Sequence, residues 1–141
     1  MTCPLCTGPG GRVLWQDDFC RVVLAEEADY PGFCRVILNA HVKEMSDLDT
    51  ASRHRLMDVV HAVETGLRAL LGPDKINLAS LGNVVPHVHW HVIPRYADDA
   101  HFPDPVWAAP RRTGQRHGTE KLEEKLAAAL RQRLSAPLGR E

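Results

Sequence analysis

Residues 87–94 read HVHWHVIP, in which three histidines alternate with apolar residues before a proline. In a strand, successive side chains point to opposite faces, so His87, His89 and His91 share one face and the apolar residues share the other. In a helix, the same histidines spread over about 200° of the circumference. The β-branched and aromatic residues between them also favour a pleated strand. We therefore predict a strand over 87–93.

Three imidazoles on one face are costly to bury, because each ring has two nitrogens that need hydrogen-bond partners. At about 3.3 Å per residue, His87 and His91 lie about 13 Å apart, which is too far for both to bind one metal ion easily. One histidine is thus available for chemistry, and a neutral imidazole is a competent nucleophile toward phosphorus or an acyl carbon. The alternative is a surface strand whose three histidines are solvated.

Length and charge narrow the class of protein. The chain has 141 residues, enough for one domain with a substantial core. The 17 Lys and Arg residues are balanced by 18 Asp and Glu residues, so the chain has no excess of positive charge that would predict nucleic-acid binding. No window approaches about 18 uninterrupted apolar residues, and Cys3 follows Met1 too closely for a signal peptide to precede it. We expect a soluble, cytoplasmic protein with neither a nucleic-acid nor a membrane partner.

The rest of the chain predicts a sheet covered by one long helix. Further strands are expected at 12–15, 19–25, 33–38 and 75–81. Apolar residues at helical spacing predict a helix that begins at Asp47 or Asp49 and ends before Gly72. Residues 19–25 and 33–38 are expected to pair antiparallel. The order of elements predicts an α+β fold with a mostly antiparallel five-stranded sheet.

The C-terminal part is expected to form a tail and a last helix. Four leucines at helical spacing predict an amphipathic helix over 119–134 that packs on this chain or on a partner: Leu122, Leu126, Leu130 and Leu134. We assign the main domain to 1–110 and the tail with its helix to 111–141. Before this helix, residues 97–107 form a proline-rich arm. Its aromatic residues, including Trp107, need a place to pack, either over the histidines, over a partner or on the sheet edge. His101, in the same arm, is a weaker site candidate.

Cys3 and Cys6 form a CxxC pair, whose spacing lets two thiolates bind one zinc ion. A redox pair is the alternative, although no strand and helix of the thioredoxin type surround it. In a reducing compartment, four cysteines are poor candidates for a disulfide framework. The residues themselves therefore leave zinc binding and redox chemistry open.

Residues 87–93 resemble the defining motif of the histidine triad (HIT) family of nucleotide hydrolases and transferases. The resemblance extends from Cys3 to about Trp107 and implies a HIT-like fold and a homodimer with two joined sheets. Zinc-carrying members use two N-terminal cysteines, a histidine before the first long helix and the first triad histidine. The resemblance thus implies a structural zinc site made of these four residues: Cys3, Cys6, His41 and His87.

The resemblance also implies a catalytic mechanism. His89 attacks the α-phosphorus of a nucleoside 5′-phosphate derivative, and water then releases the nucleoside monophosphate from the histidine. His91 donates to a phosphate oxygen or assists the leaving group. His87 either orients the nucleophile or binds zinc. No catalytic metal is required, and a histidine rather than glutamine at position 91 favours hydrolysis over transfer.

Candidate substrate-binding residues follow from the same pattern. Asn83 stands where the family usually has glutamine for the phosphate, and Val84 stands where it usually has a hydroxyl, so backbone N–H groups are expected to supply part of the phosphate contacts. Glu26 or Glu27 corresponds to a ribose-binding side chain, with a solvated acidic turn as the alternative. Asn77 is a further candidate, unless it only satisfies backbone groups.

The sequence also permits two other functions. A zinc-stabilised nucleotide-binding protein with little turnover retains the same histidines, and a metal-handling protein uses the cysteines and histidines without a nucleotide. For a hydrolase, the residues do not show whether the substrate is a nucleoside phosphoramidate or a dinucleoside polyphosphate, nor which base it carries.

Overall fold

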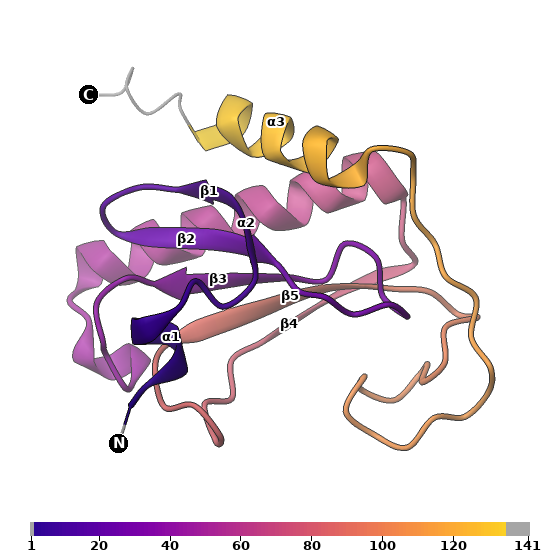
Figure 1. Cartoon of the computed structure of the whole chain (residues 1–141), viewed down its shortest axis with the longest axis horizontal. Helices are drawn as coiled ribbons and strands as arrows, with labels where there is room; N and C mark the ends of the chain where they lie inside the picture. The colour runs from indigo at the N-terminus through magenta and orange to yellow at the C-terminus, as the bar shows by residue number, and fades with distance from the viewer. Residues whose placement is uncertain (1, 135–141) are drawn as a thin grey trace.

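The fold is built on a five-stranded antiparallel sheet, seen in a computed structural model that describes residues 2–134 (Figure 1). The strands lie in the order β1-β2-β3-β5-β4, and each pairs antiparallel with its neighbours. They are β1 (Arg12–Gln16), β2 (Cys20–Leu24), β3 (Cys34–Leu38), β4 (Lys75–Ala79) and β5 (His89–Arg95). The predicted α+β class, the five strands and the antiparallel pairing are confirmed.

Several strand ends differ from the prediction by one or two residues, and two of these shifts have a visible cause. β4 ends at Ala79 rather than at residue 81, because the Ser80 hydroxyl donates to the carbonyl of His89 at 2.8 Å and replaces the next backbone rung. β5 begins at His89 rather than at residue 87, because the Val88 N–H donates to the carbonyl of Val42, beyond the end of β3.

One long helix, α2 (Thr50–Leu71), covers one face of the sheet (Figure 1). The Asp49 side chain caps it by accepting a hydrogen bond from the Ser52 N–H at 2.8 Å. Gly72 ends it with a left-handed φ of 58°. Of the two predicted caps, Asp49 is therefore the one used, and Asp47 closes the short 3-10 turn η1 (Met45–Asp47).

Side chains in and next to β5 alternate between the two faces of the sheet, as predicted. Val88 and Val92 are buried in the core under α2, and Trp90 packs against the same cluster. On the opposite face, Ile93 packs with Phe33. This second face carries the histidines. Only shorter segments lie over it, namely the N-terminal turn α1 (Pro4–Thr7) and the chain after β5.

The C-terminal helix α3 (Leu122–Leu134) packs on its own chain, beside α2 and β1 (Figure 1). Leu126 and Leu130 are fully buried in the core cluster. The helix begins three residues later than predicted, because Lys121 has a positive φ of 56° that is not helical. The last seven residues of the predicted tail, 135–141, lie outside the described residues. Within 2–134, no helix is long and apolar enough to cross a membrane.

The arm after β5 is fixed by a buried ion pair. Nε of Arg95 lies 2.8 Å from a carboxylate oxygen of Asp99, and both side chains are almost fully buried. Nδ1 of His101 lies 2.6 Å from the Tyr30 hydroxyl. The arm folds back over its own histidine face and places Trp107 against His91, which is one of the three positions that the sequence allowed.

Candidate active site

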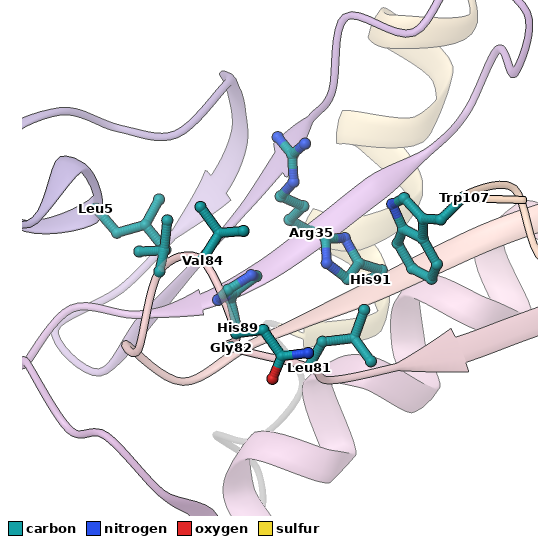
Figure 2. Close-up of a pocket in the computed structure, with 10 residues that line it drawn as sticks. Leu5, Arg35, Leu81, Gly82, Val84, His89, His91 and Trp107 are labelled. Carbon is teal, nitrogen blue, oxygen red and sulfur yellow. The ribbon is translucent and has the colours of Figure 1, made fainter.

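A cavity of about 380 Å³ opens on the histidine face of the sheet (Figure 2). Its floor is β5, flanked on one side by β3 and on the other by the loop that follows β4. Its size is within the range of small-molecule sites. The lining residues are Leu5, Arg35, Leu81, Gly82, Asn83, Val84, Val85, His89, His91 and Trp107.

His89 is held in one tautomer. Its Nδ1 lies 2.6 Å from the backbone carbonyl oxygen of His87. A carbonyl oxygen only accepts hydrogen bonds, so Nδ1 carries a proton, and in the neutral ring Nε2 carries the lone pair. The ring is 9% exposed and lines the cavity. The neutral form of His89 therefore offers Nε2 in the fixed orientation that a nucleophile needs.

His91 lies next to His89, with the two ring centroids 5.1 Å apart. Burial, together with the charges of His89 and Arg35, lowers the pKa of His91 to about 4. Its Nδ1 is buried and has no hydrogen-bond partner among residues 2–134. The ring also lines the cavity, and a neutral imidazole has one donor and one acceptor nitrogen, so His91 is suited to bind a polar group there.

His87 is separated from the other two histidines. Its Nε2 lies 2.7 Å from the carbonyl oxygen of Leu38, so Nε2 carries the proton and Nδ1 carries the lone pair. Nδ1 lies 3.4 Å from Sγ of Cys3 and 3.3 Å from Nδ1 of His41. The three histidines thus divide into a pair that faces the cavity and one that faces the N-terminal cysteines.

The cluster of Cys3, Cys6, His41 and His87 could hold a metal ion. The four ligand atoms lie within 4.8 Å of one another, and Sγ of Cys6 lies 3.3 Å from Nδ1 of His41. Tetrahedral zinc with bonds of about 2.0 Å to nitrogen and about 2.3 Å to sulfur separates its ligand atoms by about 3.3 to 3.8 Å. The donor set and these separations fit zinc, and the hydrogen bond from His87 to Leu38 supplies the outer support that zinc-bound histidines have.

The other predicted site residues are only partly brought together. Asn83 lines the cavity. Glu26 is exposed and does not line it, whereas Glu27 lines an adjoining cavity of about 90 Å³. Asn77 lies outside the cavity, where its side-chain oxygen accepts a hydrogen bond from Arg95 at 2.7 Å.

Sequence reasoning missed Arg35. It pairs opposite His91 in the β3–β5 ladder, so the two side chains lie on the same face of the sheet. Figure 2 shows Arg35 rising beside His91 within the cavity. The alternation of the strand 33–38 fixes the face on which Arg35 lies relative to its neighbours. It does not reveal which residue of β5 stands opposite.

The comparison with protein families agrees with this geometry. The family model for the HIT domain matches residues 10–98, which include both cavity histidines and His87. The chain belongs to the HIT domain family. Membership supports a nucleotide-binding or hydrolase-type function for the HIT protein described here.

Solved structures similar to this HIT protein cover most of its length. A histidine triad protein from Bradyrhizobium japonicum is 28% identical, with 89% of this chain and 92% of that chain covered and a TM-score of 0.71. One from Marinobacter aquaeolei VT8 is 29% identical, with 90% of each chain covered and a TM-score of 0.70. A zinc-bound HIT family protein from Mycobacterium smegmatis shares the fold at 22% identity, with 96% and 98% covered and a TM-score of 0.66. Comparison with curated proteins gives no match.

Proposed function

We propose that this HIT protein is a nucleotide hydrolase that cleaves at the α-phosphate of a nucleoside phosphoramidate or dinucleoside polyphosphate through a nucleotidyl-histidine intermediate. The observation that carries the proposal is the hydrogen bond of 2.6 Å from Nδ1 of His89 to the carbonyl of His87. It fixes the ring in a cavity of nucleotide size and, in the neutral ring, leaves the lone pair on Nε2.

In the first step, the Nε2 lone pair of His89 forms a bond to the α-phosphorus, and the bond from phosphorus to the leaving group breaks. In the second step, water attacks the same phosphorus, the bond from nitrogen to phosphorus breaks, and the nucleoside monophosphate leaves. Over the whole reaction, one proton of the water ends on the leaving group, and the water oxygen stays on the nucleoside monophosphate with the other proton. His89 keeps its Nδ1 proton throughout, because the His87 carbonyl holds it.

The phosphate is bound at the side of the cavity that is formed by the loop after β4. His91, whose ring lines the cavity, donates a hydrogen bond to a phosphate oxygen. Asn83 offers an amide N–H from the loop, and backbone N–H groups of residues 82–85 supply the donors that the Val84 side chain does not.

We assign a structural zinc ion to Cys3, Cys6, His41 and His87, because their ligand atoms fit tetrahedral zinc. When bound, the ion supplies a crosslink between the N-terminal turn α1 and the start of β5. No step of the reaction requires it, because the nucleophile and the phosphate donors are protein groups.

The family resemblance also supports a cytoplasmic homodimer. β4 is an edge strand of the sheet, and Leu78 and Leu81 expose 41% and 55% of their surface beside it. An edge strand with exposed apolar side chains is suited to pair with a second copy. Analytical ultracentrifugation of the full chain tests this assignment, and a monomer at micromolar concentration rejects it.

The experiment that tests the function is detection of the covalent intermediate. The protein is mixed with adenosine 5′-phosphoramidate, quenched in denaturant and weighed by mass spectrometry. We expect an added AMP on His89 in the wild type and none in His89→Asn. His61→Asn, which alters an exposed histidine of α2, retains the adduct and the rate. Nucleotide binding with neither adduct nor turnover makes the protein a zinc-stabilised nucleotide-binding protein instead.

A further inference from the structure

Arg35 occupies the flank of the cavity that the proposed mechanism does not use. The sheet order places β3 on one side of β5 and β4 on the other. The proposed phosphate donors, Asn83 and the backbone around it, come from the loop after β4. Arg35 comes from β3, and its partner in the ladder is His91. Arg35 and the start of this loop at Gly82 therefore lie on opposite sides of the histidine pair (Figure 2).

The Arg35 guanidinium group is anchored but not neutralised. One Nη1–H donates to the carbonyl of Gly10 at 3.0 Å. Among residues 2–134, no carboxylate lies within ion-pair distance of it. The two more deeply buried arginines differ in this respect, because Arg95 pairs with Asp99 and Arg21 donates to several backbone carbonyls. Arg35 alone of the three retains unpaired N–H groups beside a cavity.

The position of the anchor is itself constrained by the fold. Gly10 has a φ of 85°, and a Cβ there would lie 2.8 Å from side-chain atoms of both Ile37 and Leu5. The carbonyl that holds Arg35 is thus set by a turn that only glycine adopts without strain. A partly buried cation with one fixed N–H and others unpaired is suited to bind a planar or tetrahedral oxyanion.

We propose that Arg35 binds the phosphate group adjacent to the one that His89 attacks, so that nucleotides with two or more linked phosphates are the preferred substrates. This inference rests on the proposed function. The base and the ribose are uncharged and gain little from a guanidinium group, and the α-phosphate already has donors on the β4 side. A second phosphate is the part of a nucleotide that an arginine on the β3 side would recognise.

Binding measurements test the inference without turnover. Calorimetry gives the dissociation constants of AMP and ADP for the wild type, Arg35→Leu, Arg35→Gln and Arg35→Lys. We expect the wild type to bind ADP at least about tenfold more tightly than AMP, because charge-assisted hydrogen bonds to phosphate are strong. Arg35→Leu and Arg35→Gln should lose this preference and retain AMP affinity within about twofold. Arg35→Lys retains the charge without the paired N–H groups of the guanidinium, so its preference for ADP should lie between those of the wild type and Arg35→Leu.

Arg131→Gln is the matched control, because it removes one positive charge from the exposed surface of α3. It should leave both dissociation constants unchanged. Retained AMP affinity in the Arg35 variants shows that they are folded. Equal losses for AMP and ADP would place Arg35 at the α-phosphate and overturn the inference, as would an ADP preference that survives in Arg35→Leu.

Turnover separates this inference from the function on which it rests. The value of kcat/KM for diadenosine triphosphate should fall at least about tenfold in Arg35→Leu, and that for adenosine 5′-phosphoramidate should fall less than about twofold. If the wild type hydrolyses neither substrate but its ADP preference depends on Arg35, the hydrolase proposal fails and the phosphate subsite stands. If both substrates are hydrolysed and Arg35→Leu affects them equally, the subsite fails and the hydrolase stands.

Discussion

Nδ1 of His89 donates a hydrogen bond to the backbone carbonyl of His87 at 2.6 Å, while the His87 ring lies among Cys3, Cys6 and His41. His87 therefore belongs to both sites, with its side chain in the metal cluster and its carbonyl oxygen against the cavity histidine. A displacement of the His87 backbone displaces the His89 ring. We expect the state of the cluster to affect the orientation of the nucleophile.

Loss of the metal site should reduce both stability and activity. In Cys6→Ser, a weak alcohol ligand replaces a thiolate, so we expect the zinc content to fall and Tm to decrease by at least about 5 °C. We also expect kcat to fall by about tenfold with a smaller change in KM, because the nucleophile is misoriented while the binding groups remain. Calorimetry, metal analysis and steady-state kinetics measure these changes.

A chelator supplies the control. It should lower Tm of the wild type toward that of Cys6→Ser and should leave Cys6→Ser almost unchanged, because that variant has already lost the ion. An equal decrease in both proteins would show that the chelator acts elsewhere and that the cluster is not a metal site.

The low pKa of His91 predicts a loss of stability in mild acid. Burial, together with the charges of His89 and Arg35, lowers its pKa to about 4, whereas the unfolded chain binds a proton at its ordinary pKa of about 6.5. Between these values the unfolded state binds more protons, so the free energy of unfolding falls as pH falls. From pH 7 to pH 5, His91 should account for about 1–2 kcal/mol of this decrease.

Urea denaturation at the two pH values measures this contribution as the difference between the wild type and His91→Gln. The variant lacks the titrating ring and should lose less stability at pH 5. His61→Gln alters an exposed histidine and should retain the pH dependence of the wild type. Parallel curves for the wild type and His91→Gln would rule out a neutral, buried imidazole at position 91.

The strands and the histidine face are predictable from the sequence, because they depend on local periodicity. Alternation at period two determines which side chains share a face, whatever the rest of the chain does. The division of the three histidines is not predictable in this way. His87 faces the cysteines because its Nε2 meets the Leu38 carbonyl on another strand, and that contact is a property of the tertiary structure.

Arg35 and Asn77 illustrate the same limit for the cavity. The pairing of Arg35 with His91 depends on the register between two strands that are distant in sequence. Asn77 lies on a strand next to the histidines, but the long side chain of Arg95 reaches its amide oxygen. The family pattern predicted Asn83 as a site residue, and Asn83 lines the cavity. The pattern did not distinguish Glu26 from Glu27, of which only Glu27 lines a cavity.

The buried pair of Arg95 and Asp99 should be important for stability. Burial opposes ionisation of Asp99, but the Arg95 guanidinium and three backbone N–H groups outweigh it and hold the pKa of that carboxyl well below its usual range. Asp99→Asn leaves the Arg95 charge buried without a carboxylate partner, so we expect a loss of about 3–5 kcal/mol at pH 7. Because the folded pKa is lowered, the advantage of the wild type should shrink as pH falls below about 4, by up to about 1.4 kcal/mol per pH unit.

Asp98→Asn is the control for this loss. Asp98 is the next residue, is exposed, and pairs with His117 at the surface. A pair of this kind contributes little, and we expect a change within about 0.5 kcal/mol. Denaturant unfolding of both variants at pH 7 and pH 3 makes the comparison. Similar losses in the two would assign the effect to the chain turn rather than to the buried charge.

The turn at Gly10 links the N-terminal segment to the cavity, and a single methyl group there should disturb both. In Gly10→Ala, the residue must adopt a φ of 85° with a Cβ 2.8 Å from Ile37 and Leu5 side-chain atoms, so we expect a loss of about 2 kcal/mol or more. The carbonyl that anchors Arg35 should move with the turn, so the preference for ADP over AMP should decrease. Gly8→Ala is the matched variant, because Gly8 has an extended backbone and its nearest contact is 3.6 Å away. If Gly10→Ala lowers stability but leaves the ADP preference intact, the anchor is dispensable and Arg35 finds its phosphate without it.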